Sequence, residues 1–154
     1  MARRMSQADD LQARVERFVD AVVDFLKPIA VTAKTGRFIT QLTGSSGSVG
    51  ANYRAARRAR SHVEFTAKIG VVSEEADESE YWLARAVRHG YGDPATAKEL
   101  HAEALELTKI FGRSAKTARS RNQKPPNPKS PNPKSINQKS PNRQSPNPQS
   151  PDRQ

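Results

Sequence analysis

Nearly all apolar residues of this chain lie in its first 121 positions, and this division limits what can fold. Of the 53 Ala, Val, Ile, Leu, Met, Phe, Trp and Tyr residues, 52 lie in residues 1–121 and only Ile136 lies beyond. A chain of this length supports one ordinary domain. We therefore predict one folded domain in residues 1–121, followed by a segment that has no core of its own.

Residues 122–154 form a low-complexity tail that we predict to be disordered. They hold nine of the eleven prolines, no glycine, and six basic residues against one acidic residue, Asp152. From residue 126 the tail repeats with a period of five, as PNPKS, PNPKS, INQKS, PNRQS and PNPQS. Proline at this density prevents helix and central strand. Two interpretations stay open: a passive extension, or a flexible basic arm that adds salt-sensitive affinity for nucleic acid.

Within residues 1–121, apolar residues recur at steps of three and four, which is the spacing of one helical face. The first run extends from Leu11 to Ile29. Ser6 precedes it as a candidate N-cap, and Pro28 should end or kink the helix. The sequence therefore predicts a first helix that ends near residue 28.

Two later helices have clear start and stop signals. Ser61 and Glu64 have the spacing of a capping box, and the following apolar run stops at Gly90. Asp93 followed by Pro94 is typical of an N-cap with proline at the first helical position, and this helix should reach residue 121. Short connections imply antiparallel neighbours. We predict an all-α protein, an up-down antiparallel four-helix bundle.

A second helix should begin near Gly36, but its continuation is ambiguous. Residues 44–52, GSSGSVGAN, contain three glycines and three serines, and on intrinsic propensity they should form a loop. The opposing interpretation is that small residues such as Gly47 and Ala51 share one helical side. That arrangement would let a neighbouring backbone approach closely.

The sequence carries no recognisable catalytic or metal-binding motif. It has no cysteine, and none of His62, His89 and His101 has a glutamate three residues before it, as a di-metal bundle site requires. We expect surface histidines, no metal, no cofactor, no small-molecule substrate and no enzymatic activity. No apolar run approaches the roughly 20 residues that span a membrane, and no signal peptide is apparent, so we expect a cytoplasmic protein.

The net charge of +10 divides evenly between the tail and residues 1–121. In the folded part, arginines crowd the end of the second predicted helix, opposite acidic residues of the third. One interpretation is a solvated, partly ion-paired face, in which Glu64 or Glu75 pairs with an inward arginine. The other is a phosphate-contacting patch with little base stacking, because Tyr53 is its one aromatic residue. The candidate nucleic-acid-binding residues are Arg54, Arg57, Arg58, Arg60, Lys68, Arg113, Lys116, Arg119 and Arg121.

A longer motif resembles a known bacterial family. It comprises Gln41-Leu42, Ser48-Val49-Gly50-Ala51-Asn52-Tyr53-Arg54, Ala59-Arg60-Ser61, Glu64-Phe65, Lys68-Ile69-Gly70, Glu75-Ala76-Asp77-Glu78 and Trp82-Leu83. It is similar to four-helix-bundle proteins encoded in intervening sequences of large-subunit ribosomal RNA genes. These are related to the accessory variability determinant of diversity-generating retroelements. The resemblance covers roughly residues 8–120.

The resemblance implies that the second helix continues through residues 44–52, and that the subunits form a ring-like homopentamer. The retroelement relative is basic, binds nucleic acid and associates with a reverse transcriptase. Residues implied in bundle or subunit packing are Gly47, Val49, Gly50, Ala51, Tyr53, Phe65, Ile69, Glu75 and Trp82.

Two functional hypotheses follow from the charge pattern and the resemblance. The first is a non-enzymatic oligomeric bundle that binds RNA, DNA or an RNA–protein complex through basic surfaces, without strong sequence specificity. The alternative is a protein-interaction scaffold that docks onto a reverse transcriptase or another acidic protein.

Overall fold

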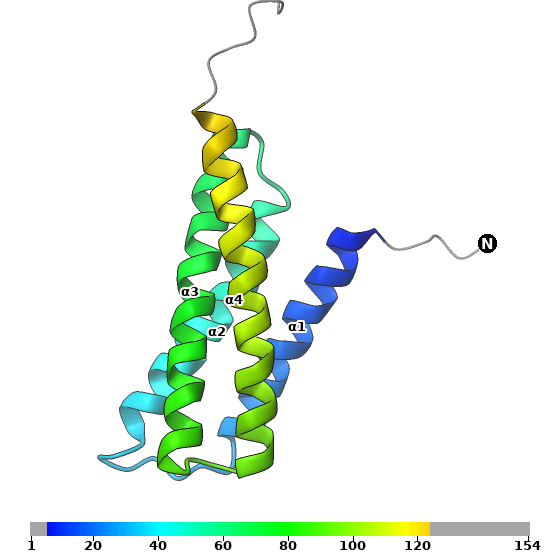
Figure 1. Ribbon diagram of the computed structural model, residues 1–154. Helices are drawn as coiled ribbons and strands as arrows, with labels where there is room; N and C mark the ends of the chain where they lie inside the picture. The colour runs from blue at the N-terminus through cyan, green and yellow to red at the C-terminus, as the bar shows by residue number, and fades with distance from the viewer. Residues whose placement is uncertain (1–5, 124–154) are drawn as a thin grey trace, which may run out of the picture. The chain divides into compact units, whose positions relative to one another are not determined.

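The computed structural model describes residues 6–123, and these residues are all-α (Figure 1). The helices are α1 (Gln7–Leu26), α2 (Gly36–Ala56), α3 (His62–His89) and α4 (Pro94–Asn122). Chain direction alternates from each helix to the next, which confirms the predicted up-down, antiparallel arrangement. Helix α4 ends one residue beyond the predicted limit of the folded part. Residues 124–154 of the predicted tail lie outside the described residues.

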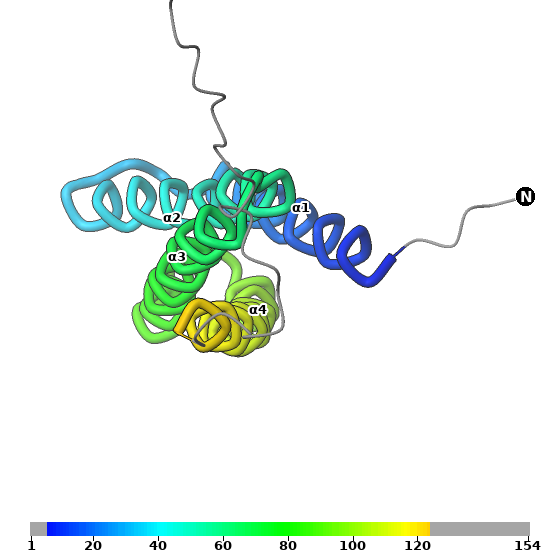
Figure 2. The backbone as a smooth tube through the Cα atoms, turned by 90° about the horizontal axis from the view of Figure 1, so that it is seen from above, coloured from blue at the N-terminus to red at the C-terminus, as the bar shows by residue number. Residues whose placement is uncertain are grey.

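The helices do not pack equally. Helix α3 lies alongside both α2 and α4 (Figures 1 and 2). Helix α1 contacts α2 and α4, but its N-terminal half diverges from them in both views. The N-terminal half of α1 is held by the buried Val15, by Leu11 and by polar contacts such as that of Arg57, described below.

The predicted apolar faces form the core. In α3, the predicted face supplies the buried residues Ile69, Val72, Ala76, Ser79, Leu83 and Ala86, while Phe65 and Val87 are half-buried. Phe111 and Leu107 of α4 and Val22 of α1 are almost completely inaccessible to solvent. Burying each large apolar side chain stabilises the fold by roughly 1.5–3 kcal/mol. The core follows from the periodicity of the sequence.

The helix ends largely follow the predicted signals. Ser6 and Asp9 form a complete capping box, Asp93 caps α4, and Gly90 ends α3 with a left-handed φ of 69°. At α3, Ser61 Oγ accepts from the Glu64 backbone N–H at 3.0 Å. The Glu64 carboxylate, however, accepts from the backbone N–H of residue 60 at 2.9 Å. The second half of the predicted capping box is therefore shifted by one residue.

Residues 44–52 are helical, which confirms the helix implied by the resemblance and excludes the loop that intrinsic propensity favours. Two serines compensate for their low helix propensity by burying their hydroxyl groups with partners. Ser46 Oγ donates to the Leu42 carbonyl at 2.7 Å, and Ser79 Oγ of α3 donates to Ser45 Oγ at 3.0 Å. Tertiary packing thus overrides local propensity here. The close approach of a neighbouring backbone is not seen: nothing lies within 4 Å of the Cβ positions of residues 44 and 47, and that of Gly50 would meet a side-chain atom of Val19 at 3.3 Å.

Within residues 6–123, none of the helices is long and apolar enough to cross a membrane.

Candidate nucleic-acid interface

Two segments far apart in sequence meet at one end of the helices. Residues 54–68 form the end of α2, the following turn and the start of α3, and residues 109–123 form the last part of α4 (Figure 1). His62 Nε2 lies 3.1 Å from the Ala118 carbonyl oxygen. Asn122 Nδ2 donates to Thr66 Oγ1 at 3.0 Å. These hydrogen bonds join the two segments, which together we call the basic end.

The basic end concentrates positive charge. It contains ten Lys or Arg residues and one acidic residue, Glu64, whereas the rest of residues 6–123 contains eight basic and fourteen acidic residues. All nine predicted nucleic-acid-binding residues lie in it, and Lys109 is the tenth cation. The excess of positive charge is therefore confined to the basic end, and the rest of residues 6–123 carries a net negative charge. Sequence position alone did not show how closely the two segments approach.

The cations of the basic end differ in exposure. Lys68 is half-buried and the other nine are exposed, namely Arg54, Arg57, Arg58, Arg60, Lys109, Arg113, Lys116, Arg119 and Arg121. The Arg119 guanidinium lies 3.5 Å from where a Cβ atom of residue 70 would be, so Gly70 leaves room for it. Arg54, Arg119 and Arg121 occupy the last turns of their helices. There they also offset the partial negative charge of a helix C-terminus.

Arg57 is engaged within the chain. Its guanidinium donates to Asp9 Oδ1 at 2.5 Å and to Gln12 Oε1 at 2.6 Å, both on α1. The Arg57 hydrogen bond, followed by those from Ser6, lowers the pKa of Asp9 to about 2. We expected Glu64 or Glu75 to hold an inward arginine. Glu64 instead lies 3.5 Å from the 91% exposed side chain of Arg60, and Arg57, which follows the last residue of α2, reaches α1.

The residues implied in packing occupy several environments. Val49, Tyr53 and Ile69 are buried; Gly47, Gly50, Phe65, Glu75 and Trp82 are half-buried; Ala51 is exposed. Burial, then the neighbouring carboxylates of Glu78 and Glu74, raise the pKa of Glu75.

Tyr53, which immediately precedes the basic end, does not offer an accessible ring for base stacking. Its ring is 6% exposed and packs against Phe111 with centroids 5.1 Å apart. Desolvation raises the pKa of its hydroxyl group. The accessible rings of the basic end are those of His62 and Phe65, which stack with centroids 6.2 Å apart. Its many exposed cations are available to phosphate groups.

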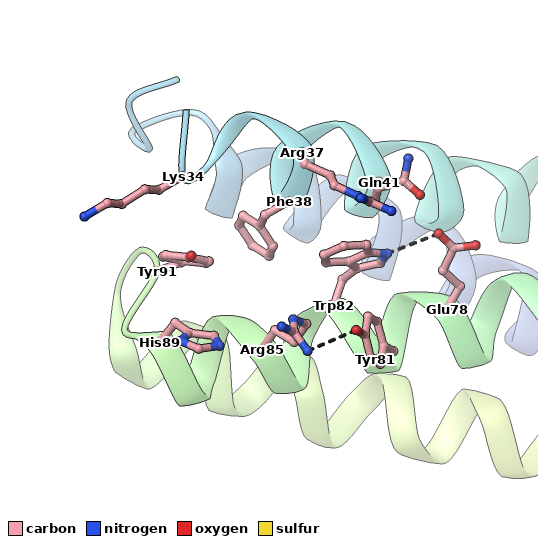
Figure 3. A pocket seen from close by; sticks show the side chains of 10 residues that line it. All are labelled: Lys34, Arg37, Phe38, Gln41, Glu78, Tyr81, Trp82, Arg85, His89 and Tyr91. Carbon is pink, nitrogen blue, oxygen red and sulfur yellow. Dashed lines mark hydrogen bonds between the residues drawn. The ribbon is translucent and has the colours of Figure 1, made fainter. Parts of the chain in front are cut away.

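A second feature, which the sequence analysis missed, is a groove between the first half of α2 and the last half of α3 (Figure 3). It has a volume of about 620 Å³. Its lining residues are Lys34, Arg37, Phe38, Gln41, Glu78, Tyr81, Trp82, Arg85, His89 and Tyr91. We call it the α2–α3 groove. The sequence does not indicate this groove, because its lining residues come from faces of two helices and from the turns beside them.

The histidines occupy different environments. His89 and His62 are exposed, whereas His101 is half-buried, with Nε2 2.7 Å from Glu80 Oε1. His101 and Glu80 lie on different helices, so no local sequence pattern indicates that they pair. Within residues 6–123 we find no group of three or more His, Cys, Asp or Glu side chains arranged to hold a metal ion.

The fold and the comparisons define the class of protein. Residues 10–113 match the family model for the 23S rRNA-intervening sequence protein. The chain belongs to this family of helical proteins. A crystal structure from Bacteroides thetaiotaomicron, described as a protein of unknown function from the S23 ribosomal protein family, is 26% identical with a TM-score of 0.58. The similarity covers 68% of this chain and 97% of that one. A search of curated proteins found no match.

Proposed function

We propose that this protein is a non-enzymatic nucleic-acid-binding bundle whose basic end contacts the phosphate backbone, with RNA as the preferred partner. The observation that carries the proposal is the ratio of ten cations to one carboxylate across two joined segments. Most of these cations are exposed. Such a surface binds phosphates with little dependence on base sequence, because the cations meet groups that every nucleotide shares.

Fluorescence anisotropy with a labelled RNA of roughly 12 nucleotides, a length within the range of single-strand binding sites, tests the proposal. A variant with Arg58, Arg113 and Lys116 all changed to glutamine removes three exposed cations of the basic end. Changing Arg17, Arg88 and Lys98 to glutamine is the matched control, because it removes the same charge from exposed positions elsewhere.

The basic-end variant should bind more weakly, and the slope of log K against log salt should become shallower by about 2. The control should change much less. Absence of binding at low salt, or equal losses in both variants, would refute the proposal. A DNA strand of the same sequence measures the preference for RNA.

We also propose that the protein self-associates, as the pentamer implied by its resemblance, and that it docks onto a protein such as a reverse transcriptase as a second function. Light scattering gives the mass directly, and a mass of one subunit excludes the pentamer. A partner recovered equally well after nuclease treatment supports the scaffold function, whereas loss of the partner after this treatment supports an RNA-mediated contact.

A further inference from the structure

The α2–α3 groove combines aromatic rings with positive charge. Phe38 and Tyr91 pack with ring centroids 5.0 Å apart, and Tyr81 meets Trp82 edge-on at 5.1 Å. In Figure 3 the Phe38 and Trp82 rings lie between the two helices, with Arg37 above the Trp82 indole, while Tyr81 lies against α3 and Tyr91 beside the turn that follows it. Phe38 is buried, so the accessible rings are those of Tyr81, Trp82 and Tyr91. The groove thus adds a second group of rings to the stacked pair of His62 and Phe65 at the basic end.

Several contacts hold these rings in place before any ligand arrives. The Trp82 indole N–H donates to Glu78 Oε1 at 3.1 Å. Arg85 donates to the Tyr81 hydroxyl at 3.0 Å, and its guanidinium lies 5.2 Å from the centroid of that ring. A ligand that stacks here need not order these side chains on binding, which lowers the entropic cost.

The charge around the rings favours an anion. Lys34 and Arg37 lie on the α2 side and Arg85 lies on the α3 side, whereas Glu78 is the one carboxylate in the lining. Lys34 and Arg37 are exposed. Aromatic faces beside free cations match a nucleotide of a single strand, because its base can stack while its phosphate meets the cations. A duplex offers few such faces, since its bases are already stacked.

We propose that the α2–α3 groove binds an unpaired base and the adjacent phosphate of single-stranded RNA. This inference rests on the proposed function and adds to it a preference for single strands. The groove and the basic end use opposite halves of α3, because Lys68 and Arg85 are about 25 Å apart along a helix that rises 1.5 Å per residue. One RNA strand that follows α3 would contact both.

Trp82 provides a direct test, because it is the only tryptophan in the chain and it lines the groove. Titration with an oligouridine of about 12 nucleotides should change its emission, and an RNA duplex of the same length should change it much less. Arg37→Gln and, separately, Tyr81→Ala should weaken oligouridine binding by about fivefold or more while duplex binding stays nearly the same. Lys98→Gln and Tyr81→Phe are the matched controls.

Three results would overturn the inference, and they are distinguishable. If anisotropy shows no binding of any RNA at low salt, the proposed function fails as well. If oligouridine binds, but changes Trp82 emission no more than the duplex does, and if Arg37→Gln and Tyr81→Ala bind it as well as the control variants do, only the groove assignment fails. If Trp82 emission instead depends on protein concentration without RNA, and Tyr81→Ala lowers the mass in light scattering, a second copy of the chain occupies the groove. Circular dichroism melts show whether each variant is folded.

Discussion

The Arg57 guanidinium spans from the end of α2 to the first turns of α1, where it donates to the Asp9 carboxylate at 2.5 Å. The Arg57 side chain is only 27% exposed as a result. Two of the nine predicted phosphate contacts are paired within the chain, but Arg60, which pairs with Glu64, stays 91% exposed, whereas Arg57 does not. A phosphate group would have to compete with Asp9 for Arg57.

Releasing Arg57 should strengthen binding to RNA. We predict that Asp9→Asn raises affinity more than Asp10→Asn does, although both changes remove one negative charge. Asp10 is exposed and, among residues 6–123, forms no ion pair, so it isolates the effect of net charge. Anisotropy at a fixed salt concentration measures the difference. Equal gains in the two variants would show that Arg57 is not held back by this ion pair.

The same ion pair makes stability depend on pH. The folded-state pKa of Asp9 is about 2, below its ordinary value of 3.8. Its stabilising contribution is therefore fully present above about pH 4 and is lost as pH falls toward 2. Urea unfolding across this range should show a smaller loss of stability for Asp9→Asn than for the original protein. Other carboxylates titrate here too, so the comparison between the two proteins is the informative quantity.

The hydroxyl pair between α2 and α3 should show strong coupling. We predict that Ser79→Ala lowers the free energy of unfolding by about 1–2 kcal/mol, because the buried Ser45 Oγ loses its donor at 3.0 Å. Changing both residues to alanine should cost little more than one change alone. Denaturant titration of a double-mutant cycle measures this. Additive losses would mean that the two hydroxyl groups stabilise the protein independently.

Two glycines should respond in opposite directions to alanine. Residue 47 is helical with nothing within 4 Å of its Cβ position, so Gly47→Ala should stabilise the subunit by about 0.5–1 kcal/mol. Gly92 has a φ of 70°, and a Cβ atom there would lie 2.5 Å from Phe25. Gly92→Ala should therefore cost at least about 1–2 kcal/mol. Thermal melts at low protein concentration test both changes. Destabilisation by Gly47→Ala would mean that another subunit packs against residue 47.

The fold was largely predictable because its signals are local. Ser6, Pro28, Gly90 and Asp93 act within a few residues of themselves, and the steps of three and four define each buried face. Residues 44–52 were ambiguous for the opposite reason. Their helix depends on partners in other helices. The clearest example is Ser79 of α3, which hydrogen-bonds to Ser45 and lies too far along the chain for residues 44–52 to indicate it.

The candidate site was less predictable. The sequence shows where the cations lie along the chain. Whether a cation is available to a ligand depends on the path of another helix, as the hydrogen bond from Arg57 to Asp9 of α1 shows. The α2–α3 groove requires the register between Arg37 and Trp82, which are separated by 45 positions. Neither the helical period nor the charge pattern contains that register.

The unequal distribution of charge gives the described part of the chain an electric dipole, with the end of α4 at its positive pole. As a polyanion comes within the screening length of ~8 Å at physiological salt, its field exerts a torque that turns this end toward it. Many random encounters then become productive orientations. For the proposed binding to RNA, salt should consequently slow association more than it hastens dissociation.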